Sequence, residues 1–278
     1  MTAAGAIQGS DPILQMLAVT RRYGTRSNPV VALSQVSMEV RPQDRLGVVG
    51  ESGSGKSTLA RLLLILEDPD EGEVRFQGRS MSGKSRSELA ELRRAVQIVF
   101  QDPFSSLDPR LRVGDSIAEP LRSLGIQGDH RSRVQELLDA VGLPAGSARM
   151  YPHQFSGGQR QRVAIARALA SQPRVLVADE AVSALDVSVR AQVLNLLARL
   201  VERFGLTLVF ISHDMAVVRH ICTRVVVLYR GQVVEQGPVE QVFRDPQHPY
   251  TQALISSVPT LGGRIVSPPT FDWESPSS

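Results

Sequence analysis

Short apolar runs bounded by turn residues alternate along this chain with longer segments of helical periodicity. The apolar runs predict strands at 13–19, 30–40, 45–49, 73–77, 96–100, 175–178, 206–211, 225–228 and 232–235. Apolar residues at helical spacing predict helices at 59–66, 87–94, 134–141 and 188–204. Polar stretches at 25–29 and 78–86 indicate loops.

The order of these elements predicts an α/β fold, because strands that alternate with helices favour a parallel sheet with helices on its faces. The strand at 13–19 is expected at a sheet edge. The last two strands are joined by Arg230-Gly231 and are expected to form a hairpin, which adds an antiparallel edge. We expect a mainly helical insertion at about 102–170.

Composition agrees with one folded domain between two tails. Of the 278 residues, 42% are hydrophobic, which suits a packed core. We expect a loose tail over 1–12, a domain over 13–259 and a flexible end over 260–278. Neither a signal-peptide pattern at the start nor an apolar run long enough to span a bilayer is visible. The chain is therefore expected in the cytoplasm, either soluble or held at a membrane by partners.

Charge and cysteine content exclude some function classes. The 31 basic and 28 acidic residues are spread along the chain and give a net charge of +3, so no dense basic block indicates a nucleic-acid partner. The lone Cys222 excludes an intramolecular disulfide and a cysteine-only metal cluster. We expect it to be a small buried residue.

The stretch Gly50–Thr58 fits the phosphate-binding pattern G-x-x-x-x-G-K-S, between a predicted strand and a predicted helix. Glycines let backbone N–H groups turn toward one anion, and the helix adds its positive N-terminus. Lys56 can reach the outer phosphates, and the Ser57 hydroxyl can bind magnesium. The alternative is a serine-glycine linker that happens to precede Lys-Ser, but a linker does not require the flanking elements. The residues expected to hold nucleotide here are Gly50, Ser52, Gly53, Ser54, Gly55, Lys56, Ser57 and Thr58.

Two carboxylates follow the apolar strand at 175–178. Strands that end in acids are common, so alone this is a weak signal. Next to a phosphate loop it is stronger, since the carboxyl ends of parallel strands meet at the edge where such loops lie. Asp179 is expected to hold magnesium, and Glu180 to polarise the water that attacks the γ-phosphorus.

A second helix start suited to an anion lies at Ser156–Gln159, with the sequence Ser-Gly-Gly-Gln. Ser156 is a good N-cap, and Gly157 and Gly158 allow an anion close to the backbone. The alternative is an ordinary capped helix, for which two adjacent glycines would be costly. Gln159 completes the motif.

Together, in this order and spacing, these motifs resemble the ATP-binding cassette (ABC) ATPase family over about 13–259. The resemblance implies a P-loop NTPase core with an antiparallel β-subdomain and an inserted helical subdomain, and ATP and Mg²⁺ as cofactors. It also implies that Ser156–Gln159 closes over ATP held by a second subunit. Ser156 and Gly158 would thus serve the partner's nucleotide, while Lys56 serves this chain's own.

The resemblance extends to four further residues. Tyr23 resembles the aromatic that stacks on adenine, although an exposed tyrosine at a strand end would look the same. Gln101 resembles the glutamine that contacts magnesium and couples ATP to the transport subunits. Asp186, at the end of Ser183-Ala184-Leu185-Asp186, resembles the acid of a loop that crosses the dimer interface. His213 resembles the histidine that contacts the γ-phosphate, although a histidine after an apolar strand is more often a polar strand end. The expected catalytic residues are therefore Glu180, His213 and Gln101.

The chain departs from the family pattern at two places. Ala181-Val182 stands where a proline and a threonine are usual, and Phe155 replaces the commoner leucine before Ser156. Because the replacements are apolar, we expect the phosphate chemistry to be intact.

The stretch Phe243–Leu254 resembles the ending of ATPase subunits of oligopeptide, dipeptide and nickel importers, within a C-terminal segment at about 238–259. Glu180–Val189 and the long loop between Tyr23 and Val30 indicate the same branch. His248-Pro249-Tyr250 can also be simply the start of a capped helix, so its value is expected to be diagnostic and not catalytic. Some relatives carry clustered cysteines near this end, and their absence here predicts no iron–sulfur cluster.

The resemblance implies a mechanism built from two half-sites. ATP closes the subunit dimer, hydrolysis reopens it, and the region after Gln101 passes the movement to membrane subunits. The expected partners are a second ABC ATPase subunit (a paralogue, giving a heterodimer), two transmembrane permeases and an extracytoplasmic solute-binding protein, at the cytoplasmic face of the inner membrane.

Three other functions deserve comparison. Soluble cassette ATPases of translation or DNA repair typically have two cassettes or long coiled-coil insertions, and neither is visible here. A regulatory subunit that only binds ATP would not need both Glu180 and His213. An exporter with separate membrane chains is possible, but the C-terminal resemblance favours import.

Overall fold

The computed structural model describes residues 11–25, 28–102 and 106–257. The predicted tails lie almost entirely outside the described residues. Within these ranges, no helix combines the length and the apolar character needed to cross a membrane.

The larger sheet of the described chain is mainly parallel. Its spatial order is β10-β9-β3-β8-β7-β6. The strands are β3 (Arg45–Val49), β6 (Val96–Val99), β7 (Val175–Asp179), β8 (Thr207–Ser212), β9 (Arg224–Tyr229) and β10 (Gln232–Pro238). Only β10 of this order runs antiparallel to its neighbour, so the predicted hairpin is confirmed. Arg230 and Gly231 form its turn with positive φ angles of 46° and 78°, as tight hairpins prefer.

The smaller sheet is antiparallel, in the order β2-β1-β4-β5. Its strands are β1 (Leu14–Thr25), β2 (Asn28–Val40), β4 (Glu71–Phe76) and β5 (Arg79–Ser80). The prediction of an edge strand at 13–19 was wrong, because β1 pairs with both β2 and β4. Alternating burial indicates which face of a strand is covered, not whether both of its backbone edges are paired.

Two predicted loops contain strand. The β1–β2 hairpin extends until Thr25 pairs with Asn28, so most of the predicted loop at 25–29 is paired backbone. Likewise, β5 lies inside the predicted loop at 78–86. Most of the described residues of both segments are exposed, and polarity alone does not exclude pairing in an antiparallel sheet.

The predicted helices are present with shifted ends. The α-helices are α1 (Lys56–Leu63), α2 (Arg86–Ala95), α4 (Val113–Ser123), α5 (His130–Ala140), α6 (Gly157–Leu169), α7 (Val187–Phe204), α8 (Met215–Ile221), α9 (Val239–Arg244) and α10 (Pro249–Ser256). Short 3₁₀ turns occupy Ala145–Arg149 and Pro152–Gln154. Helix α1 begins directly after Gly55 and ends before Ile65, whose φ of 52° is left-handed.

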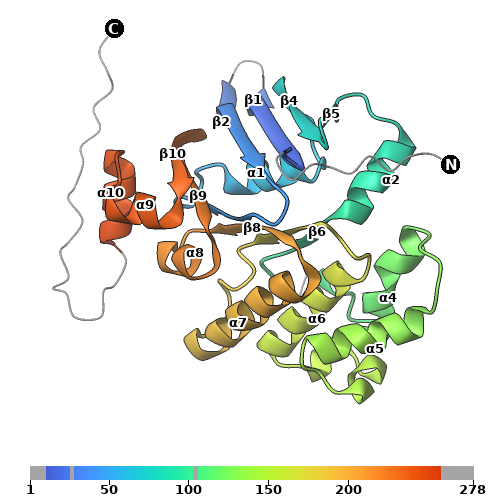
Figure 1. Ribbon diagram of the computed structural model, residues 1–278. Coiled ribbons are helices and arrows are strands. Elements are labelled where there is room, and N and C mark those ends of the chain that lie inside the picture. Colours follow the sequence, from blue (N-terminus) through green and yellow to red (C-terminus); the bar gives the residue numbers. More distant parts are fainter. Residues whose placement is uncertain (1–10, 26–27, 103–105, 258–278) are drawn as a thin grey trace, which may run out of the picture.

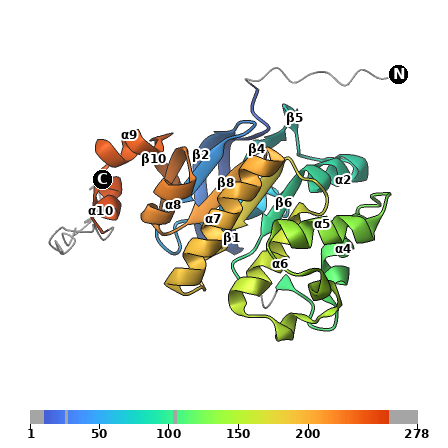
Figure 2. The same ribbon diagram turned by 60° about the horizontal axis from the view of Figure 1, so that its bottom comes forward.

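The elements form layers around the parallel sheet (Figure 1). Val177 and Val209 on one sheet face pack with α1 and the antiparallel sheet. Leu176 and Phe210 on the other face pack with α6, α7 and α8. Helices α4 and α5 lie beside α6, on the side away from the antiparallel sheet (Figures 1 and 2). The strands are therefore buried on both faces, as expected for parallel sheets.

Cys222 lies in the core next to Gly47 of β3, the strand that precedes the phosphate loop. Its side chain is buried, and burial raises the pKa of its thiol. The predicted role as a small core residue is confirmed.

Candidate nucleotide site

The phosphate loop joins β3 to α1 at the carboxyl edge of the parallel sheet. Gly53 and Gly55 have positive φ angles of 82° and 106°, which favour glycine. A Cβ on Gly55 would lie 2.5 Å from the Ala32 carbonyl oxygen, and one on Gly50 would lie 2.2 Å from the Leu228 carbonyl oxygen. Both ends of the loop therefore need glycine for space within the chain as well as for an anion.

Lys56 is buried inside the loop. Its Nζ donates hydrogen bonds of 2.7 Å to the carbonyl oxygens of both Gly50 and Glu51. Burial lowers the pKa of Lys56, while the carboxylates of Glu180 and Asp179 act in the opposite direction. An ammonium group has three donors, so one remains for a phosphate oxygen.

The two predicted acids follow β7 at the same edge. The backbone N–H of Glu180 donates to the Ile211 carbonyl oxygen at 2.9 Å, which fixes the acid beside the end of β8. Glu180 has a φ of 45°, a strained conformation for a residue with a side chain and one that often occurs at functional sites. Burial, followed by the charge of Glu180, raises the pKa of Asp179.

His213 follows β8, and its Nδ1 lies 3.4 Å from Oε1 of Glu180. The sequence predicts the two residues separately, and the fold brings them together because β7 and β8 are parallel neighbours. The imidazole can hold the Glu180 carboxylate in place and remains exposed enough to contact a ligand.

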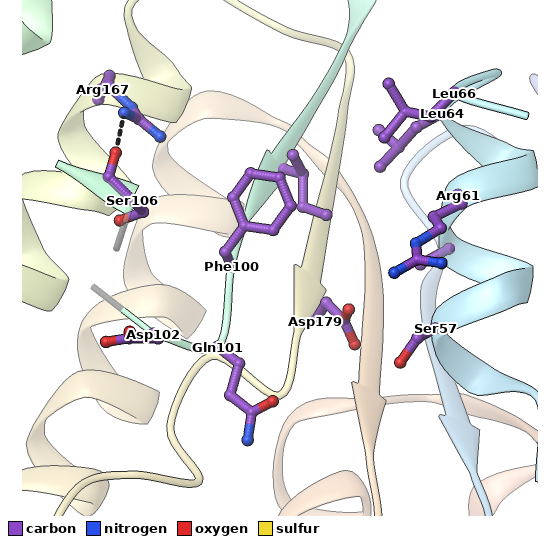
Figure 3. A pocket seen from close by; sticks show the side chains of 12 residues that line it. Ser57, Arg61, Leu64, Leu66, Phe100, Gln101, Asp102, Ser106, Arg167 and Asp179 are labelled. Carbon is purple, nitrogen blue, oxygen red and sulfur yellow. Dashed lines mark hydrogen bonds between the residues drawn. The ribbon is translucent and has the colours of Figure 1, made fainter. Parts of the chain in front are cut away.

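Ser57, Gln101 and Asp179 line one cavity of about 570 Å³. In Figure 3 the Asp179 carboxylate and the Ser57 hydroxyl face each other, with the Gln101 amide below them. Hydroxyl, carboxylate and amide oxygens suit magnesium, which prefers oxygen ligands and retains places for phosphates and water. The three predicted metal residues are thus brought together, and their donor set fits the predicted ion.

Sequence reasoning did not identify the other wall of this cavity. Phe100 and Leu66 line it with side chains that are 42% and 58% exposed. Arg167 lies across the cavity from Leu66, and its guanidinium donates to the Ser106 carbonyl oxygen (Figure 3). In the sequence, the one signal for Phe100 was its position directly before the predicted Gln101.

The Ser156–Gln159 motif starts α6 with a capping box. The Ser156 hydroxyl accepts from the Gln159 N–H at 3.3 Å, and the Gln159 side chain accepts from the Ser156 N–H at 2.9 Å. A Cβ on Gly158 would lie 2.4 Å from Cγ1 of Val189, whereas one on Gly157 would lie 3.7 Å from its nearest neighbour. The motif does not line the cavity of Ser57 and Asp179.

Two other predicted residues have local partners. The Tyr23 hydroxyl donates to Glu67 at 2.5 Å, and the Arg21 guanidinium lies 5.0 Å from the ring centroid. Asp186 caps α7 by accepting from the Val189 N–H at 3.0 Å, and this bond lowers the pKa of Asp186. Their nucleotide and interface roles stay predictions.

Tyr250 is the residue that sequence reasoning missed most clearly. Its hydroxyl oxygen accepts a 2.9 Å hydrogen bond from the backbone N–H of Glu51, inside the phosphate loop. The segment expected to be only diagnostic therefore touches the nucleotide loop directly.

Comparison with known proteins decides the family. Residues 33–183, more than half of the chain, match the family model described as ABC transporter. The chain belongs to the ABC transporter family. Residues 234–270 of this ABC protein match a second model, the oligopeptide/dipeptide transporter C-terminal region. The family and branch predicted from the motifs are confirmed.

Curated relatives of this ABC protein include the glutathione import ATP-binding protein GsiA. The chain is 51% identical over 258 residues to the protein of Escherichia coli K12 and 52% identical to that of Salmonella typhimurium LT2. Each match covers 90% of this chain and 41% of the relative. The chain therefore spans about two fifths of the length of these relatives.

Solved structures confirm the predicted fold class. One is the ATP-binding cassette MJ0796, a dimer in a post-hydrolysis state bound to ADP and Pi, with a TM-score of 0.73 and 32% identity over 81% of this chain and 98% of that one. Another is cbiO1 from Clostridium perfringens, part of the transporter complex cbiONQ, with a TM-score of 0.74 and 28% identity over 85% and 92% of the two chains.

Proposed function

We propose that this ABC cassette binds and hydrolyses ATP to drive import of a peptide or related solute through a membrane transporter. One observation carries the ATPase part: Ser57, Gln101 and Asp179 line a single cavity at the carboxyl edge of the sheet. Lys56 and Glu180 lie at the same edge, close enough for their charges to interact. The C-terminal match at 234–270 supports the importer part.

Each side chain has a role in this proposal. Lys56 binds the outer phosphates with its remaining donor, and the loop N–H groups bind the others. Ser57, Gln101 and Asp179 hold Mg²⁺, which when bound neutralises charge on the phosphates. Glu180 acts as general base and accepts a proton from the water that attacks the γ-phosphorus. His213 orients the Glu180 carboxylate and contacts the γ-phosphate. Gly50–Thr58 and Tyr23 would hold the rest of the nucleotide.

A second chain is part of the proposed site. The capped Ser156–Gln159 helix start lies apart from the cavity in its own chain, and a Cβ on Gly157 would meet only Leu185 Cδ2, at 3.7 Å. In the proposal this motif closes over ATP on another ABC subunit, with Asp186 at the contact. A solved relative is a dimer, which supports pairing. We propose a paralogue as the second chain.

Apolar side chains that line the cavity support a membrane partner. Phe100, next to Gln101, and Leu66, across the same cavity, expose apolar surface that a segment of a permease would bury. We propose two permeases and an extracytoplasmic solute-binding protein, with this chain at the cytoplasmic face of the inner membrane. Residues 13–259 form the cassette in this proposal, with 102–170 as the helical subdomain and 238–259 as the C-terminal segment.

The solute class rests on the relatives. The curated relatives are named for glutathione import, and glutathione is a small peptide. Small peptides are therefore the first class of solute to test, and nickel the second.

The experiment is to co-purify the chain with the products of adjacent genes and reconstitute the complex in vesicles. ATP should drive peptide uptake, and Lys56→Ala in the same complex should abolish it. A stable monomer with full ATPase activity and no membrane partner would contradict the importer proposal.

A further inference from the structure

Tyr250 joins the C-terminal segment to the phosphate loop. The two bonded residues, Tyr250 and Glu51, are 199 positions apart in the sequence. Tyr250 is only 7% exposed, and Figure 1 shows α10 beside α9 and β10 at the side of the core. The bond is therefore a long-range contact made by a buried side chain.

The peptide unit between Gly50 and Glu51 is held from both sides. Its carbonyl oxygen, on Gly50, accepts from Lys56 Nζ at 2.7 Å, and its N–H, on Glu51, donates to Tyr250 at 2.9 Å. A peptide unit is planar, and its C=O and N–H point in opposite directions. Whatever fixes the N–H direction therefore fixes the carbonyl that positions the Lys56 ammonium.

Tyr250 is itself held firmly. Its ring packs against Tyr229, with centroids 4.2 Å apart and planes tilted by 33°. His248 caps α10 by accepting from the Tyr250 N–H at 3.1 Å. The two Glu235 oxygens accept the N–H groups of Gln247 and His248, each at 3.0 Å. Strand β10 thus anchors the segment that carries the hydroxyl.

The same C-terminal part holds the loop at a second point. The N–H of Gly231, in the β9–β10 turn, donates to the Ser54 carbonyl oxygen at 2.9 Å. The loop is thus fixed at positions 51 and 54 by residues that follow β9. A loop fixed in this way loses less conformational freedom when ATP binds.

We propose that Tyr250 is a positioning residue for ATP binding, whose hydroxyl orients the Gly50–Glu51 peptide and through it Lys56. This inference rests on the proposed function, since it assumes that the loop binds ATP. It assigns a role in the nucleotide site to the C-terminal segment.

The test compares Tyr250→Phe with Tyr229→Phe in the full chain. Both changes remove one hydroxyl from the same ring pair, but only the first removes the bond to Glu51. We expect Tyr250→Phe to weaken binding of MgADP and of a non-hydrolysable ATP analogue two- to tenfold in calorimetric titrations, the range for one hydrogen bond. Tyr229→Phe should bind within twofold of the wild type. In the assembled complex, Tyr250→Phe should raise KM for ATP by the same factor and leave kcat unchanged.

A second variant tests the route of the effect. Glu235→Ala releases Gln247 and His248, so it should weaken nucleotide binding in the wild-type background. In the Tyr250→Phe background it should add less than a twofold effect, because Glu235 is proposed to act only through the Tyr250–Glu51 bond, which that background already lacks. Independent, multiplying effects would contradict the proposed route.

Failure of the inference and failure of the proposed function give different results. If the wild type binds nucleotide and Tyr250→Phe binds it as tightly as Tyr229→Phe does, only the role of Tyr250 is overturned. If the wild type binds neither nucleotide, the ATPase proposal fails and this inference fails with it.

Discussion

Gly158→Ala separates the structural from the functional need for two adjacent glycines at the start of α6. An ideal Cβ on Gly158 would lie 2.4 Å from Cγ1 of Val189, at the start of α7. Carbon atoms pack best at about 3.5–4.0 Å, so the Val189 side chain, α6 or α7 must move by about 1 Å. The new methyl group therefore strains the contact between the two helices whose N-caps are Ser156 and Asp186.

The expected cost follows from overpacking. Extra methyl groups in packed sites destabilise by about 1–3 kcal/mol. Replacing a helical glycine by alanine returns up to about 1 kcal/mol, and less in a first turn. We therefore expect Gly158→Ala to lower the free energy of unfolding by about 1–2 kcal/mol. Gly157→Ala should change it by less than about 0.5 kcal/mol, since its nearest neighbour would be Leu185 Cδ2 at 3.7 Å.

Equilibrium urea unfolding, followed by far-UV circular dichroism, measures both values. Val189→Ala removes the clashing atom, so adding Gly158→Ala to it should cost almost nothing. Gly157→Ala should fold normally and still lose ATPase activity in the assembled complex, because Gly157 belongs to the Ser156–Gln159 motif that is proposed to close over the partner's phosphate. Additive losses for Gly158→Ala and Val189→Ala would refute the packing argument.

Three further predictions concern the loop and the core. Lys56→Ala should weaken MgATP binding about ten- to a hundredfold, the range for lost hydrogen bonds to charged groups, and calorimetric titration measures it; unchanged affinity would place the nucleotide elsewhere. Gly55→Ala should lower the free energy of unfolding by about 1–3 kcal/mol in urea unfolding, because the φ of 106° at Gly55 and its approach to the Ala32 carbonyl both exclude a side chain. A stability equal to the wild type would refute this. Cys222 should resist a thiol reagent in the native protein and react fully after denaturation, because burial raises the pKa of its thiol; rapid native labelling would show that α8 opens easily.

The features predictable from the sequence are those set by local chemistry. The phosphate loop, the acids after β7 and the Ser156 cap each depend on residues within a few positions of one another. The contact between Glu180 and His213 could have been predicted, since both residues follow parallel strands of one sheet.

The features that escaped prediction depend on distant parts of the chain. The position of β1 inside its sheet is set by pairing with β4, and its own residues report only which face is buried. The Tyr250 bond to Glu51 leaves no local signal, because the folding of β9, β10 and α10 brings the hydroxyl to the loop. The packing of Gly158 on Val189 is also invisible until α6 and α7 are placed.

The central claim is that this chain holds a hydrolytic ATP site built around Glu180, and Glu180→Gln tests it most directly. MgATP affinity and the turnover rate of the assembled complex are measured for this variant and the wild type. The account predicts an unchanged affinity and a turnover lowered at least about a hundredfold, the usual contribution of a general base. Turnover at the wild-type rate would contradict it.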